Sequence, residues 1–125
     1  MKIEVPISSG ELVDKLSILE IKKIEIKDEE KLKQVVNEFN VLKEVYEKLF
    51  NNSKEIESLY RKLLKINREL WEIEDKIRKF EKEEKFDEEF IEHARRVYKT
   101  NDKRFEIKSQ INKMFNSEIQ EQKEY

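Results

Sequence analysis

The chain has 125 residues, of which 45% are charged and 37% hydrophobic, and its 27 basic and 29 acidic residues leave a net charge of −2. This length suits a single domain, residues 1–125, with one core. The two signs of charge are interspersed, and without a basic excess the sequence disfavours nucleic acid as a partner. The absence of cysteine excludes disulfides and thiolate zinc sites. No apolar run approaches a membrane span, and residues 1–8 lack the apolar stretch of a signal peptide, so we expect a cytoplasmic protein with no membrane partner.

The N-terminal segment alternates apolar and polar residues. Ile3, Val5 and Ile7 alternate with Lys2, Glu4 and Pro6, which predicts an extended arm over residues 1–8. Proline confines such a segment to an edge position, and the sequence predicts no second strand beside it. We therefore expect the arm either to lie on the rest of the chain or to pair with a second copy of itself.

Beyond residue 10 the chain has neither glycine nor proline, and its apolar residues recur at spacings of three and four. This pattern predicts long α-helices, because both strong helix breakers are missing. Ser8 and Glu11 have the spacing of a capping box, so the first helix is expected from about Ser9 to Lys27. Its apolar residues lie on two sides, which predicts a central helix or one in an oligomer interface.

The remaining helices follow from local composition and spacing. The apolar phase slips near Asp28, where we expect a break or a sharp kink, so the first two helices are either separate or one kinked helix. The run Asn51-Asn52-Ser53 ends the second helix and caps the third. Asp87 is the expected N-cap of a fourth helix that ends near Phe115, before a polar tail over residues 117–125. The fold prediction is an all-α antiparallel bundle of three to four long helices.

Two of these helices carry mixed aromatic and polar stripes. The third helix also has an apolar seam with coiled-coil spacing, formed by Ile56, Leu59, Leu63, Ile66, Leu70, Ile73, Ile77 and Phe80. Its second stripe consists of Tyr60, Leu64, Asn67, Trp71, Glu74 and Arg78. The stripe of the fourth helix that we expect to face the core consists of Phe90, Ala94, Val97, Tyr98, Asn101, Phe105, Lys108, Asn112 and Phe115.

If these faces meet the first helix, seven polar residues converge into a candidate ligand-binding cluster: Glu20, Asn67, Glu74, Arg78, Asn101, Lys108 and Asn112. We expect Asn101 to be buried and the ammonium of Lys108 to find its counter-charge in Glu20 or Glu74, because buried polar groups need partners. Two interpretations remain open. The cluster fixes the register of the bundle, or it holds a small polar or anionic molecule.

Metal-dependent chemistry has weaker support. Glu44-x-x-Glu47 and Glu72-x-x-Asp75 are similar to the paired acidic helices of the all-α, magnesium-dependent nucleotide pyrophosphohydrolases. The pattern is loose in so acidic a chain, and these pairs point away from the apolar seams. The single histidine, His93, has no Glu-x-x-His spacing, so a di-iron site is disfavoured. The sequence thus predicts no metal site, no cofactor and no catalytic residue, with the pyrophosphohydrolase as a remote alternative.

Three segments together resemble a family of small bacterial and phage proteins known only as a domain of unknown function: SSGELVDKL at 8–16 with ILEIK at 18–22, LWEIED at 70–75 and VYKTNDKR at 97–104. The ending EQKEY also fits, and the likeness is weakest through the second helix. The resemblance implies a stand-alone, single-domain protein and supplies no activity.

The sequence therefore favours a non-enzymatic helical interaction or adaptor module that self-associates as a homodimer and can bind a protein partner. The alternative is a small-molecule binder or enzyme with its site among the first, third and fourth helices.

Overall fold

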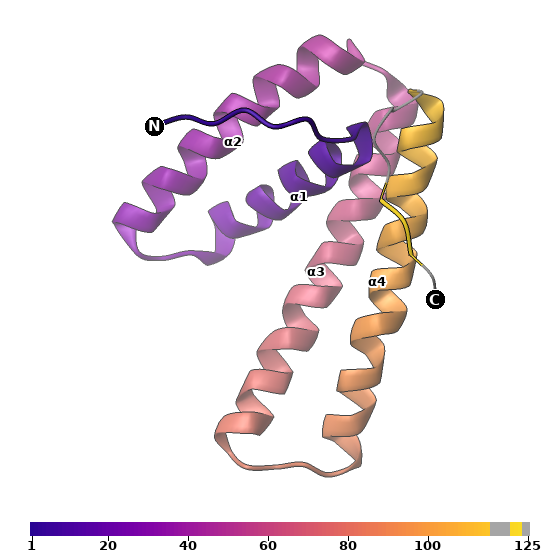
Figure 1. Ribbon diagram of the computed structural model, residues 1–125. Coiled ribbons are helices and arrows are strands. Elements are labelled where there is room, and N and C mark those ends of the chain that lie inside the picture. The colour runs from indigo at the N-terminus through magenta and orange to yellow at the C-terminus, as the bar shows by residue number, and fades with distance from the viewer. Residues whose placement is uncertain (116–120, 124–125) are drawn as a thin grey trace.

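The fold is all-α, as predicted. In the computed structural model, which describes residues 1–115 and 121–123, the described residues form four helices and no strand. Figure 1 shows their arrangement. The helices are α1 (Ser9–Glu25), α2 (Glu29–Phe50), α3 (Lys54–Lys82) and α4 (Glu88–Met114). Within this part of the chain, no helix combines the length and the apolar character needed to cross a membrane.

Each helix begins at a polar side chain that accepts a hydrogen bond from a backbone N–H of the first turn, which would otherwise have no partner. The four capping residues are Ser8, Asp28, Ser53 and Asp87. The caps predicted at Ser8, Ser53 and Asp87 are thus confirmed. The break predicted near Asp28 is a full interruption, because α1 ends at Glu25 and α2 starts at Glu29.

The helices form two antiparallel hairpins, α1–α2 and α3–α4, and α1 packs against all three other helices. In Figure 1 the α1–α2 pair lies on one half of the longer α3–α4 hairpin, whose far half projects as a two-helix stalk. The buried core joins α1, the start of α3 and the end of α4 through Leu12, Val13, Ile56, Leu63 and Ile111. Burial on several sides gives α1 the central position that its sequence indicates.

The sequence predicted the buried residues of α3 more accurately than those of α4. Every residue of the predicted α3 seam is buried or half-buried. On α4 the predicted stripe was partly wrong: Tyr98 is 53% exposed and Ala94 is exposed, whereas Thr100 and Ile111 are buried. The reason is that the stalk has only one partner helix for α4, so an aromatic residue beside that narrow contact faces solvent.

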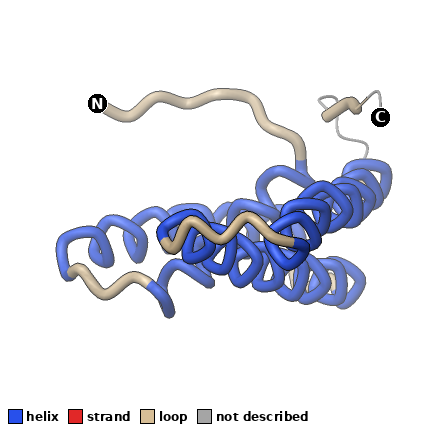
Figure 2. The backbone as a smooth tube through the Cα atoms, turned by 90° about the horizontal axis from the view of Figure 1, so that it is seen from below, coloured by secondary structure: helices blue, strands red, loops and turns tan. Residues whose placement is uncertain are grey.

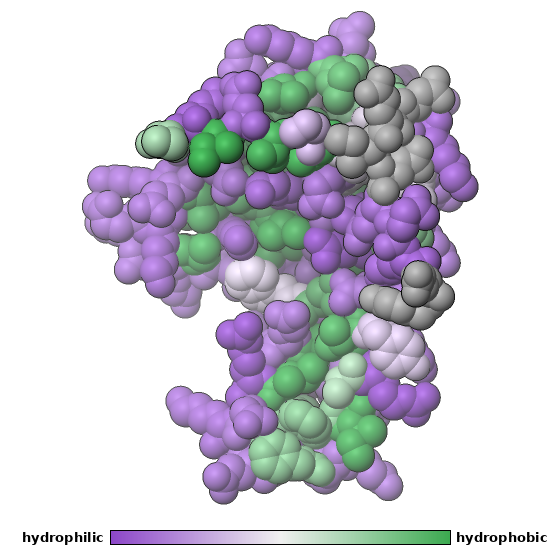
Figure 3. Space-filling model, viewed as in Figure 1, coloured by the Kyte–Doolittle hydropathy of each residue, from purple (hydrophilic) through white to green (hydrophobic). Residues whose placement is uncertain are grey.

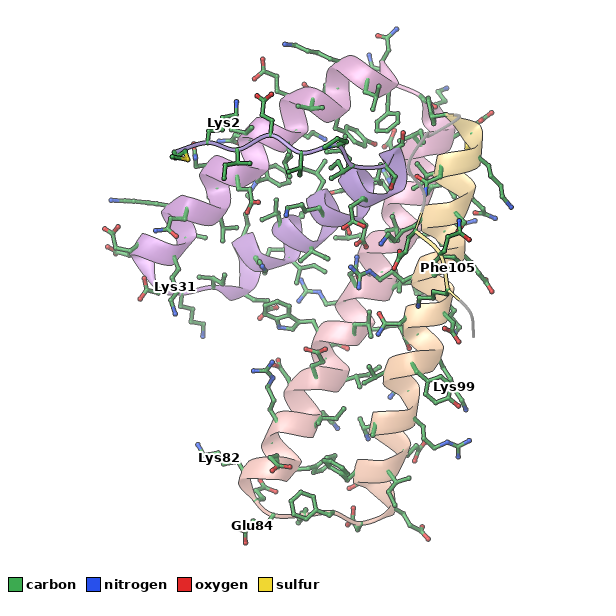
Figure 4. The ribbon with its side chains drawn as sticks, viewed as in Figure 1. Lys2, Lys31, Lys82, Glu84, Lys99 and Phe105 are labelled. Atoms are coloured by element: carbon green, nitrogen blue, oxygen red, sulfur yellow. The ribbon has the colours of Figure 1, made fainter. Side chains whose placement is uncertain are left out.

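Residues 1–7 and 121–123 lie outside the four helices. Figure 2 shows residues 1–7 as an extended segment that leaves α1 and runs alongside the helices. Most of the predicted polar tail, residues 117–120 and 124–125, lies outside the described residues. The described part, 121–123, passes α4 near Phe105, which Figure 4 labels. The Lys123 ammonium there lies 5.4 Å from the centroid of the Phe105 ring.

Gly10 sets the distance between α1 and α4. It is buried in the first turn of α1, and its N–H donates to Asn112 Oδ1 at 2.7 Å. A Cβ atom at this position would lie 2.4 Å from the carbonyl oxygen of Lys108 and 2.9 Å from Asn112 Oδ1. Glycine is therefore required here by close approach of two helices rather than by its backbone freedom.

We expect Gly10→Ala to destabilise the protein by about 1–3 kcal/mol, because the new methyl group overpacks a contact made by α4 backbone. The sign of the change in the free energy of unfolding is informative, because Gly→Ala within a helix normally stabilises a protein by about 0.5–1 kcal/mol. Urea denaturation followed by circular dichroism measures the difference. The exposed Ser58→Ala on α3 serves as the control, with a change of no more than about 0.5 kcal/mol. Stabilisation by Gly10→Ala would mean that α1 and α4 are further apart.

Candidate functional site

The polar side chains buried in this bundle gather where α1 crosses α3 and α4. Asp14, Ser17, Asn67, Lys108 and Asn112 are buried there. The three on α3 and α4 were predicted from the sequence, whereas the two on α1 were not. The site is therefore built around a residue that the helical patterns did not identify, Asp14.

The carboxylate of Asp14 is fully buried and is shared by both helices of the hairpin. Its Oδ1 accepts from Asn67 Nδ2 of α3 at 2.9 Å and from Arg104 Nε of α4 at 2.8 Å. Arg104 Nη2 donates to Oδ2, which completes a bidentate pair with the geometry that guanidinium and carboxylate prefer. Ser17 Oγ accepts from Asn67 at 2.8 Å and donates to the Asp14 carbonyl at 2.7 Å. We call these four side chains, Asp14, Ser17, Asn67 and Arg104, the Asp14 network.

Arg104 extends the Asp14 network along α4. Its hydrogen bond to Asp14 raises the pKa of the guanidinium despite partial burial, so its charge is secure. Its Nη1 also donates to Asn101 Oδ1 at 3.4 Å. Asn101 is thus hydrogen-bonded as predicted, but it is half-buried rather than buried.

Lys108 lies one turn further along α4 and is 6% exposed. Its ammonium contacts Glu11 Oε2 of α1 and Glu121 Oε2 of the tail, both at 2.8 Å. Burial alone would lower the pKa of Lys108, but the hydrogen bonds to these two carboxylates outweigh it and raise the pKa above 10.5. The counter-charges predicted for Lys108, Glu20 and Glu74, were wrong, because Lys108 faces the first turn of α1.

Three residues of the predicted cluster lie elsewhere. Glu20 accepts from the Tyr60 hydroxyl at 2.7 Å, away from the Asp14 network. Glu74 and Arg78 are exposed and lie 4.0 Å from each other. The cause is the length of α1: its last residue, Glu25, pairs with Arg68 of α3, so α1 ends before it can cover the more distant turns that carry Glu74 and Arg78.

One feature of the sequence could have identified the missed residues. Gly10, Asp14, Ser17 and Ile21 follow one another at spacings of four, three and four, and so form one face of α1. Three of its residues, Gly10, Asp14 and Ser17, are small or polar, and all four are buried. A helix that is already apolar on two sides has this third side to place against a neighbour, and polar residues on it then need partners.

The polar groups of this site pair with one another through hydrogen bonds and ion pairs within the protein. Among the described residues, every buried side-chain nitrogen and oxygen has a hydrogen-bond partner. The adjoining cavity measures about 50 Å³ and lies between Arg104, Lys108 and Glu121. That volume suits a water molecule, whereas pockets for small molecules measure roughly 300–1,000 Å³.

The acidic pairs considered for magnesium do not gather either. Glu44, Glu47, Glu72 and Asp75 are all exposed, on α2 and α3. Over residues 1–115 and 121–123, no three histidine, aspartate or glutamate side chains are placed to hold a metal ion. The two helices thus present these carboxylates to solvent rather than to a common centre.

Comparison with known proteins identifies one family. The model of a family of unknown function, DUF6165, matches residues 1–125, which confirms the resemblance to a family of unknown function noted from the sequence. No curated protein and no solved structure matches the chain.

We expect Asp14→Ala to cost about 1–3 kcal/mol, because it leaves the half-buried Arg104 guanidinium without its counter-charge and buried Asn67 without an acceptor. Chemical denaturation measures this, with Glu44→Ala as the control. Glu44 pairs with Lys48 on the exposed face of α2, so its loss should cost no more than about 1 kcal/mol.

In a double-mutant cycle, Asp14→Ala and Arg104→Ala should show a coupling of about 0.5–3 kcal/mol. Additive effects would mean that the two residues do not form one unit.

The raised pKa of Lys108 also makes stability depend on pH. A lysine whose folded-state pKa lies above 10.5 contributes stability below that pH and loses it as the pH rises through the folded-state value. We therefore expect Lys108→Met to show a shallower fall in melting temperature than the wild type as the pH rises above about 10.5. Exposed Lys62→Met is the control, and it should follow the wild type. Parallel curves for all three proteins would contradict the pairing of Lys108 with Glu11 and Glu121.

Proposed function

We propose that the chain, which belongs to the DUF6165 family of unknown function, is a non-catalytic helical interaction module that self-associates through its N-terminal arm. The observation that carries this proposal is the arm itself. Residues 1–7 are extended and exposed, and no strand among the described residues pairs with them. An exposed, extended apolar segment whose backbone is not paired in a sheet is a site at which another chain can pair with it.

The large apolar side chains of the arm are exposed to solvent. Ile3 is 75% and Val5 67% exposed, and both lie on the same side of the alternation as Ile7. Figure 3 shows this apolar surface on the arm. A row on α2, Val41, Val45 and Leu49, is also exposed at a spacing of four and adds a helix face to the unpaired apolar surface. A two-stranded ribbon alone is marginal in water, so further apolar contacts support the association.

A second copy of the chain fits the arm by charge. In an antiparallel pair with Ile3 opposite Ile3, Lys2 of each chain lies opposite Glu4 of the other, and Pro6 lies outside the paired residues. In such an interface both chains use the same residues, as in the twofold-symmetric dimers that are the commonest oligomers. Within one chain Lys2 Nζ lies 3.5 Å from Glu4 Oε1, and both side chains are exposed, so dimerisation would exchange this pair for two equivalent pairs between the chains.

The alternative function, binding of a small polar or anionic molecule among α1, α3 and α4, has less support. The Asp14 network satisfies its own polar groups, and the cavity beside it is about 50 Å³. The remote alternative, a magnesium-dependent pyrophosphohydrolase, lacks support from the exposed acidic pairs on α2 and α3.

The proposal is tested by cross-linking, because the chain has no cysteine of its own. We expect Ile3→Cys to form a disulfide-linked dimer under mild oxidation, since paired residue 3 positions lie within disulfide distance across an antiparallel ribbon. Ile24→Cys on α1 is the matched control, with 68% exposure against 75% for Ile3. It should stay largely monomeric on non-reducing gels. Equal cross-linking of the two variants would contradict pairing through the arm.

Charge reversal provides the matching measurement in solution. Lys2→Glu and Glu4→Lys should each weaken the dimer in sedimentation equilibrium, because like charges then face each other across the ribbon. The double variant restores opposite charges and should recover the association. A wild-type chain that remains monomeric at micromolar concentration would overturn the proposal.

A further inference from the structure

A second feature of the molecule, which shares no residue with the Asp14 network, is a cleft of about 450 Å³ where α1, α2 and α3 meet. This volume falls within the range of small-molecule sites, roughly 300–1,000 Å³. The residues of its wall that carry the argument are Glu20, Lys43, Tyr46, Glu47, Glu57 and Tyr60.

Aromatic rings form one part of the wall. Tyr46 of α2 and Tyr60 of α3 have ring centroids 5.8 Å apart and planes inclined at 58°. Phe50 packs edge-on against Tyr46 at 5.0 Å, which fixes the position of that ring. The electron-rich faces of such rings attract cations.

The cleft already holds one ammonium group. Lys43 Nζ lies 4.9 Å from the Tyr46 centroid and 6.0 Å from the Tyr60 centroid, within the distance of cation–π contacts. The volume of about 450 Å³ remains with Lys43 in this position. The two rings therefore already contact a cation, and the space beside them is still large enough for a small ligand.

The charges of the wall favour the same sign of ligand. Glu57 is neutralised by Arg61, whose Nη2 lies 2.8 Å from Glu57 Oε1. Glu20 and Glu47 then remain against the single positive charge of Lys43. Glu20 accepts from the Tyr60 hydroxyl at 2.7 Å, so its carboxylate is held at the cleft. An organic cation gains from these carboxylates, whereas an anion is repelled.

We infer that this cleft binds a small organic ammonium compound beside the contacting Tyr46 and Tyr60 rings, at the position now taken by the Lys43 ammonium, with Lys43 as an internal competitor that the ligand displaces. The displaced lysine has a flexible four-carbon stem, so its ammonium can turn into solvent and leave Glu20 and Glu47 to the ligand. The site is separate from the arm and does not depend on self-association.

The probe is choline, and its neutral isostere 3,3-dimethylbutan-1-ol is the control ligand. We expect choline to shift the tyrosine ring resonances in NMR titration and to saturate, with the neutral alcohol bound at least about tenfold more weakly. Equal binding of the two ligands would overturn the inference, because the cleft would then recognise shape and apolar surface alone.

Variants separate the roles of the residues. Lys43→Met removes the competing ammonium but keeps an unbranched stem, and should tighten choline binding by about tenfold. Lys48→Met, on the exposed side of the same helix, should leave the affinity unchanged. Tyr46→Phe retains the aromatic face and should retain binding, whereas Tyr46→Leu should lose it, with circular dichroism confirming that both variants fold. Unchanged affinity in Lys43→Met, or equal binding by the two Tyr46 variants, would contradict the assigned site.

Discussion

The arrangement of this bundle depends on one buried carboxylate. Asp14 lies on the central helix and is bonded by Asn67 of α3 and Arg104 of α4, so one side chain connects three helices. Apolar helix faces alone permit neighbouring registers, because hydrophobic contact has no direction. A fully buried charge permits only the register in which its partners reach it, since any other leaves it unpaired at a cost of several kcal/mol. The Asp14 network therefore contributes specificity to the packing of α1 more than it contributes net stability.

The same register explains the contacts on either side of Asp14. One turn earlier, Gly10 brings α1 against the backbone of α4 and donates its N–H to Asn112. On that side too, Glu11 reaches the ammonium of Lys108. The start of α1 is thus fixed by close approach, hydrogen bonding and charge together. Because Ser8 caps this fixed helix start, the arm leaves the bundle at a defined point instead of continuing over the core.

Local features of the sequence predicted local features of the structure. The caps at Ser8 and Ser53 and the break at Asp28 depend on residues within one turn of each other, and all three were predicted. The partners of Lys108 were not, because they depend on where α1 begins relative to α4. Glu74 was assigned to the site because helical spacing gives a direction around the axis but not how far along α3 the neighbouring helix extends. Asp14 was missed since two apolar sides of α1 were considered and the third was not.

The division between the buried cluster and the two exposed surfaces follows from the same physics. A polar group whose hydrogen-bond partners all lie within the protein has no donor or acceptor left for a ligand. The Asp14 network is therefore suited to hold the helices together rather than to bind a ligand. Unsatisfied capacity lies instead where packing is incomplete: in the backbone and apolar side chains of the arm, and in the aromatic faces of Tyr46 and Tyr60 beside an open cleft. Both surfaces lie on segments that contact α1 or continue from it. The Asp14 network thus fixes the position of α1, against which both surfaces are placed.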